Sequence, residues 1–144
     1  MIAVGQYSDA MRALGRFLEM VRASEVIVVD QPDIVEVSWR GKKGNREEKQ
    51  YRSWELDALR TWARLVRGLE EGQLRFGTQE ALRMLGREVD ILKLQGVTSV
   101  QTSDGWWISG KIEGTDVRQN YTIADLQLKS QKFHAQRISE EARR

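Results

Sequence analysis

The sequence predicts an α+β protein made by tandem duplication, in which a helix, a three-stranded antiparallel meander and a second helix occur twice. Three observations predict this fold. The chain matches itself, both copies show the same order of helical and strand periodicity, and a unit of about 65 residues buries too little core to be stable alone. We therefore expect units at residues 6–70 and 77–138, packed as an intrachain pseudo-dimer or joined through their sheets, and a flexible tail at residues 139–144.

The internal match is clearest in the first predicted helix. A shift of 71 residues lays residues 10–16 on residues 81–87, with five of seven positions identical. The match continues with Val26 on Val97, Ser38 on Ser109 and, after a one-residue deletion, Tyr51 on Tyr121 and Leu56 on Leu126.

The opening helix of each copy is predicted from apolar spacing. Met11, Leu14 and Leu18 recur at helical intervals after Ser8, an expected N-cap, and in the second copy Thr78 is the expected cap. Gly15 and Gly86 lie inside these helices, where glycine costs about 1 kcal/mol relative to alanine. We interpret this repeated cost as a sign that another backbone crosses closely there; the alternative is a kink or a ligand that approaches the helix.

Alternating and β-branched residues predict the strands. Residues 26–29 form a β-branched run, residues 31–33 a turn, and residues 34–40 a strand with Val35, Val37 and Trp39 on one face. Trp106, Ile108 and Gly110 take these places in the second copy. Residues 40–46 have the glycines of a hairpin, and a polar third strand ends at Tyr51 or Tyr121.

A closing helix completes each copy. In the first it begins near Ser53, with an apolar stripe formed by Leu56, Leu59, Ala63 and Val66. In the second, Thr122 and Asp125 have the spacing of a capping box, and the stripe is weaker.

Composition argues against most chemistry. The chain has no cysteine, one histidine (His134), and 23 basic against 21 acidic residues, so we expect no cofactor, no metal site and no catalytic residues. Residues 105–111 have the G-x-x-x-x-G-K spacing of a phosphate-binding loop, but Ile112 stands where Ser or Thr is needed, and we predict a strand. Without a signal peptide or a long apolar run, a cytoplasmic location is expected.

Two groups of residues are candidates for binding. Trp39, Trp106 and Trp107 are candidates for an interaction surface, and Trp106 and Trp107 must point to opposite faces of one strand. The predicted hairpin carries Arg40, Lys42, Lys43 and Arg46, a basic tip suited to nucleic acid, although Glu47 and Glu48 follow at once.

The order helix, three strands, helix resembles the double-stranded RNA-binding domain, a resemblance of topology that implies RNA binding. That family has a lysine-rich signature at the start of its second helix, where this chain has residues 53–56 (Ser-Trp-Glu-Leu) and 122–125 (Thr-Ile-Ala-Asp). The segment 11–19, Met-Arg-Ala-Leu-Gly-Arg-Phe-Leu-Glu, also resembles the opening helix of small uncharacterised bacterial proteins.

The sequence therefore favours a non-catalytic protein-interaction or scaffold module that self-associates or binds a protein partner. The alternative is a weak nucleic-acid-binding protein that uses the basic hairpin. An enzyme is the least favoured class, because no acid, base, nucleophile or metal ligands converge in the pattern.

Overall fold

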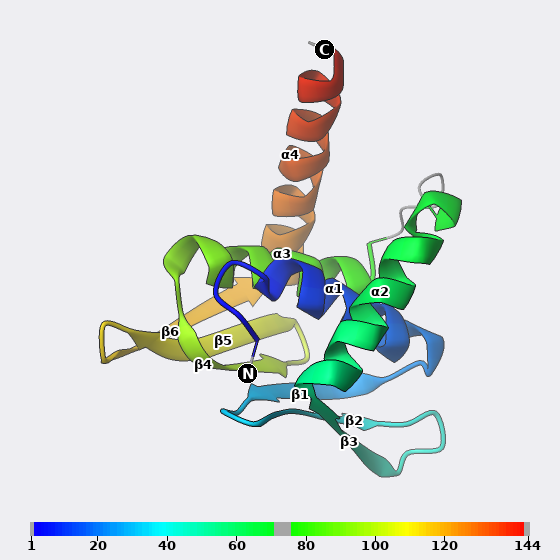
Figure 1. Cartoon of the computed structure of the whole chain (residues 1–144), viewed down its shortest axis with the longest axis vertical. Coiled ribbons are helices and arrows are strands. Elements are labelled where there is room, and N and C mark those ends of the chain that lie inside the picture. The colour runs from blue at the N-terminus through cyan, green and yellow to red at the C-terminus, as the bar shows by residue number, and fades with distance from the viewer. Residues whose placement is uncertain (1, 71–75, 143–144) are drawn as a thin grey trace.

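The computed structural model describes residues 2–70 and 76–142 and has the predicted α+β fold. Two αβββα halves follow one another along the chain and form one six-stranded antiparallel sheet (Figure 1). The elements of the first half are α1 (Tyr7–Met20), β1 (Ser24–Asp30), β2 (Ile34–Arg40), β3 (Arg46–Arg52) and α2 (Ser53–Glu70). Those of the second are α3 (Thr78–Leu92), β4 (Gln95–Gln101), β5 (Gly105–Ile112), β6 (Thr115–Thr122) and α4 (Ile123–Ala142).

The two meanders join through their first strands. The strand order is β3-β2-β1-β4-β5-β6, and Val28 of β1 lies opposite Ser99 of β4. These two residues are also equivalent under the 71-residue shift, so a pseudo-two-fold axis passes between them. The fold class and the joined sheets are thus as the sequence predicts, and the phosphate-loop spacing lies within strand β5.

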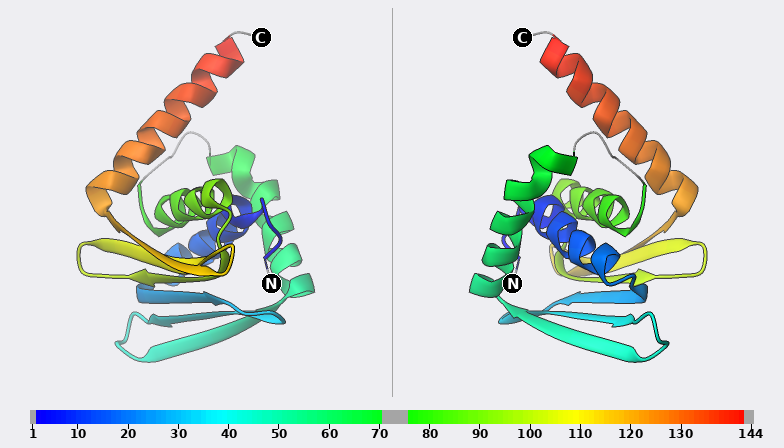
Figure 2. Two further views of the ribbon diagram at one scale, coloured as in Figure 1. Left: turned by 90° about the vertical axis from the view of Figure 1, so that its left-hand side faces the viewer. Right: turned by 90° about the vertical axis from the view of Figure 1, so that its right-hand side faces the viewer.

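Helices α1 and α3 pack against each other on one face of the sheet (Figures 1 and 2). A Cβ on Gly15 would lie 2.6 Å from the Cα of Gln79, and one on Gly86 would lie 2.5 Å from the carbonyl oxygen of Tyr7. The middle of each helix therefore meets the first turn of the other. This confirms the predicted close crossing of backbones at both glycines.

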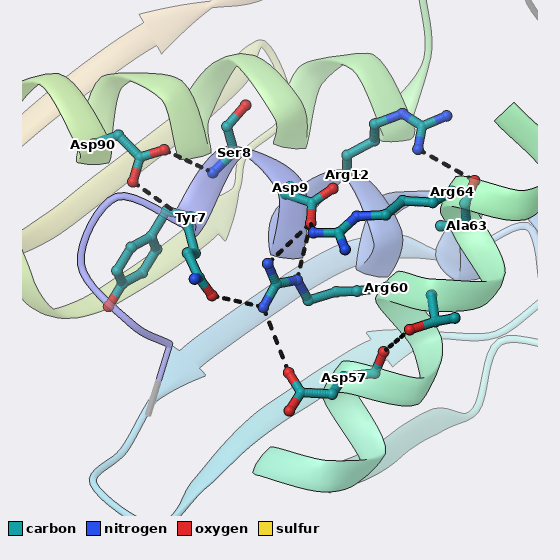
Figure 3. A network of polar contacts seen from close by, with 11 residues as sticks. Tyr7, Ser8, Asp9, Arg12, Asp57, Arg60, Ala63, Arg64 and Asp90 are labelled. Atoms are coloured by element: carbon teal, nitrogen blue, oxygen red, sulfur yellow. Dashed lines mark hydrogen bonds and ion pairs between the residues drawn. The ribbon is translucent and has the colours of Figure 1, made fainter.

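The first turns of α1 and α3 are capped from the partner helix. The carboxylate of Asp90, near the end of α3, accepts hydrogen bonds from the backbone N–H groups of Tyr7 and Ser8, each 3.0 Å long (Figure 3). Reciprocally, Glu19 near the end of α1 accepts one from Gln79 N–H at 2.9 Å. The expectation of local caps at Ser8 and Thr78 was wrong, because both residues lie inside their helices.

The core lies between the sheet and the two central helices. Val35, Val37 and Trp39 are buried on one face of β2, and Trp106 and Ile108 occupy the matching face of β5. Leucines of α1 and α3 at the predicted spacings fill the space above them, namely Leu14, Leu18, Leu82 and Leu85. One core spans both halves, as expected if neither half is stable alone.

The closing helices differ in how they pack. Helix α2 lies along the side of the body, whereas the C-terminal turns of α4 point away from it (Figures 1 and 2). The predicted capping box is present, since Thr122 and Asp125 exchange hydrogen bonds. The tail was predicted to start at residue 139, but α4 continues to Ala142. Residues 143–144 of the predicted tail and residues 71–75, which lie between the two predicted units, are outside the described residues.

Candidate protein-interaction surface

The three tryptophans predicted to form an interaction surface do not form one. Trp39 and Trp106 are only 4% and 2% exposed, so they are core residues of this chain. The prediction was wrong for both, because their strand face is the one covered by α1 and α3. Trp107 points to the opposite face, as alternation requires, and is half-buried with the Arg118 guanidinium 4.2 Å from its ring centre.

The exposed tryptophans lie instead on α2. Trp54 is 70% exposed, Trp62 is 55% exposed and Leu65 is 70% exposed. Together with the exposed Ala58 and Thr61 they make one continuous helix face, because at 3.6 residues per turn all five lie within an arc of about 100°. We call this face, formed by Trp54, Ala58, Thr61, Trp62 and Leu65, the α2 stripe.

The α2 stripe faces solvent because the other side of α2 is fixed to the body. Leu56 and Ala63 are buried there, and Leu59 packs against the core. These three residues lie about 180° around the helix from Trp54. Helix α2 therefore has apolar residues on two opposite faces, and the body covers one of them.

A polar clamp holds α2 in this orientation (Figure 3). Asp9 of α1 accepts a hydrogen bond from Arg60 Nε at 3.0 Å and also pairs with Arg64, and Arg60 donates to Gln6 at 2.8 Å. Arg12 reaches the carbonyl oxygen of Ala63 at 3.5 Å. Burial acts to raise the pKa of Asp9, but hydrogen bonds and charge from Arg64 and Arg60 prevail and hold that pKa below its ordinary value.

The second half places different residues at the equivalent positions. A shift of 70 residues takes the α2 stripe to Ala124, Leu128, Gln131, Lys132 and Ala135 of α4. Lysine and glutamine replace Trp62 and Thr61, and alanine replaces Trp54 and Leu65. The two tryptophans of the stripe therefore have no counterpart in α4, although α4 exposes Leu128 and Ile138.

The clamp has a counterpart in the second half with different chemistry. Glu80, equivalent to Asp9, is buried and contacts Ser130 at 3.0 Å and His134 at 2.9 Å, the residues equivalent to Arg60 and Arg64. Both contacts go to the same Glu80 oxygen, so the Ser130 hydroxyl donates to the acid and is not activated by the histidine. This cluster attaches α4 and borders a groove of about 590 Å³ beside that helix.

The basic hairpin is partly neutralised by its neighbours. Arg40 forms an ion pair with Glu25 at 3.1 Å, and Arg46 donates to the Glu25 carbonyl oxygen at 2.7 Å. Lys42 and Lys43 are exposed at the tip. Two of the four predicted contacts thus serve the fold, and two remain available to a ligand.

The described residues contain no group of three or more histidine, aspartate or glutamate side chains able to hold a metal ion. Within residues 2–70 and 76–142, no helix is both long and apolar enough to cross a membrane. Comparisons with protein-family models, curated proteins and solved structures found no match. The two resemblances noted in the sequence therefore stay predictions, and function is argued from the geometry of this chain.

Proposed function

We propose that this chain is a non-catalytic protein-interaction module that self-associates through the α2 stripe. The observation that carries the proposal is the exposure of Trp54 and Trp62 on one face of one helix. Tryptophan is enriched at the energetic centre of protein interfaces, and contiguous exposed apolar patches mark docking sites. Among the other exposed large apolar side chains, Val4, Met20 and Ile91 lie on separate segments, and Ile123, Leu128 and Ile138 lie on α4, which exposes no tryptophan.

The packing of α2 supports a preformed site. Its inner face is buried at Leu56 and Ala63, and the ion pairs of Asp9 with Arg60 and Arg64 attach it to α1. A partner would therefore meet side chains on a helix that is already ordered. Little backbone entropy is then lost on binding, which favours association.

The described titratable groups support a non-catalytic role. Glu80 is buried and contacts the half-buried His134, and the hydroxyl of Ser130 beside them donates to the acid. Asp9 is occupied by two arginines. In both arrangements the carboxylate is already paired with side chains of this chain.

The test is sedimentation velocity over a wide range of protein concentration. The purified chain is expected to show a concentration-dependent dimer, and Trp54→Ser with Trp62→Ser is expected to raise its Kd at least about 30-fold, since hot-spot residues are worth about 2 kcal/mol or more. The matched control is Leu128→Ser, because Leu128 is 51% exposed at the α4 position equivalent to Ala58. The proposal is contradicted if the chain stays monomeric, or if the Kd of the dimer does not change when both tryptophans are replaced.

The alternative is weak binding of nucleic acid by the hairpin tip. It has less support, because Arg40 and Arg46 both lie against Glu25. Replacement of Lys42 and Lys43 by glutamate should abolish salt-sensitive retention on nucleic acid if the alternative is correct. Equal retention of the variant and the original chain would remove it.

A further inference from the structure

We infer that the α2 stripe docks on the α2 stripe of a second copy in antiparallel orientation, across a two-fold axis near residue 60. This inference rests on the proposed function and names the partner and its geometry. Three features of α2 lead to it: the order of large and small side chains, the order of charges beside them, and the area that they expose.

The order of side-chain sizes is self-complementary when one helix is reversed. The α2 stripe has tryptophan at its start, alanine and threonine near its middle, and a second tryptophan followed by leucine toward its end. Reversal about residue 60 places Trp54 opposite the partner's Leu65 and Trp62 opposite the partner's Ala58. Large side chains then meet small or flexible ones, and the small residues allow the helices to approach. Parallel pairing would instead place each tryptophan against the same tryptophan of the second copy.

The charges beside the α2 stripe favour the same orientation. Asp57 and Arg64 lie on the same side of the stripe, two helical turns apart, with side chains 70% and 58% exposed. Antiparallel pairing about residue 60 brings each Asp57 toward the partner's Arg64. Opposite charges at the rim fix register and orientation.

The exposed area indicates a reversible dimer. At about 200 Å² per tryptophan, the fractions exposed at Trp54 and Trp62 leave on the order of 250 Å² of indole surface on each copy. A standard interface buries about 800 Å² per partner, so the α2 stripe needs its flanking residues to reach even a small interface. We therefore expect exchange between monomer and dimer.

Cysteine cross-linking tests the orientation, because the chain has no cysteine of its own. Thr61→Cys would lie near the two-fold axis, where the reactive sulfurs of two copies can meet. In Leu65→Cys, the cysteine would lie about 15 Å along the helix axis from the same cysteine of the second copy, at 1.5 Å rise per residue. This distance is too long for a disulfide. The matched control is Gln131→Cys, the α4 equivalent of Thr61 and also exposed.

The expected result is rapid disulfide dimer formation by Thr61→Cys under mild oxidation, with Leu65→Cys no faster than Gln131→Cys. Rapid reaction of both α2 variants would show parallel pairing and overturn the inference. If all three cysteine variants form disulfides only at the background rate, while sedimentation still shows a tryptophan-dependent dimer, this pairing is refuted and the proposed function stands. Circular dichroism of each variant checks that its helix content is unchanged. If the original chain forms no dimer, the proposed function itself is refuted.

Discussion

Replacing Gly86 by alanine tests the central feature of the fold, which is the contact between α1 and α3. A Cβ at this position would lie 2.5 Å from the carbonyl oxygen of Tyr7 and 2.8 Å from the Cα of Ser8. Both atoms belong to backbone and cannot rotate away. Since carbon atoms normally approach to about 3.5 Å, α1 must move by on the order of 1 Å.

The cost of Gly86→Ala follows from two opposing effects. Overpacking costs about 1–3 kcal/mol, and rigid neighbours favour the upper end of that range. Alanine stabilises a helix by about 1 kcal/mol relative to glycine. The net effect of Gly86→Ala is therefore a decrease of about 2 kcal/mol in the free energy of unfolding. For a chain of this size the corresponding fall in Tm is about 4–8 °C.

Urea denaturation followed by circular dichroism and tryptophan fluorescence measures the effect of Gly86→Ala. Ala135→Gly, at an exposed position in α4, is the control for helix propensity and should lose about 1 kcal/mol. Gly15→Ala should resemble Gly86→Ala, because its Cβ would lie 2.6 Å from the Cα of Gln79. The double variant should lose less than the sum, since one displacement relieves both clashes. If Gly86→Ala is as stable as the original chain, or more stable, the close crossing does not exist.

Three further predictions concern single side chains. The Asp9 pKa is lowered by folding, so the stability that Asp9 contributes is present above its ordinary pKa of about 3.9 and is lost as pH falls through the lower folded pKa. The cost of Asp9→Asn in urea denaturation should therefore shrink from pH 7 toward acid, and a pH-independent cost would contradict the clamp. Asp90→Ala should cost about 1 kcal/mol through the lost cap of α1, and an unchanged urea midpoint would argue against that cap. Trp106→Ala should cost about 3–5 kcal/mol, whereas Trp54→Ala should leave the monomer almost as stable, and equal losses would contradict their opposite burial.

The sequence predicts the fold well where the signals are local or repeated. Strand β2 spans residues 34–40 as predicted, because three alternating residues and flanking turns fix both its period and its ends. The internal repeat predicts the symmetry, and Gly15 and Gly86 predict the helix crossing. The caps of α1 and α3 were missed, since Asp90 and Glu19 come from the helix on the other side of the pseudo-two-fold axis.

The candidate surface was missed for a different reason. Apolar spacing in residues 53–70 predicts a buried stripe through Leu56 and Ala63, and both are buried. The same helix has a second apolar face, and at about 100° per residue Trp54 and Trp62 point away from the first one. That angular separation is the signal in the sequence that could have identified the exposed tryptophans. Tertiary packing decides which of the two faces the body covers. The ion pairs of Arg60 and Arg64 with Asp9 hold α2 with Leu56 and Ala63 facing the body.

The first half has the α2 stripe, and the equivalent face of α4 in the second half has no tryptophan. This difference bears on how the chain would assemble. A duplicated chain with an apolar stripe on both α2 and α4 would have two docking faces, so each copy could bind two others and extend into an open assembly. Here α4 has Lys132 and Gln131 at the positions of Trp62 and Thr61. Buried positions such as Leu56 and Leu126 are alike in the two halves, while these exposed positions differ. Under the proposed pairing, one self-complementary stripe per chain is satisfied by one partner across a two-fold axis, and we expect association to stop at the dimer.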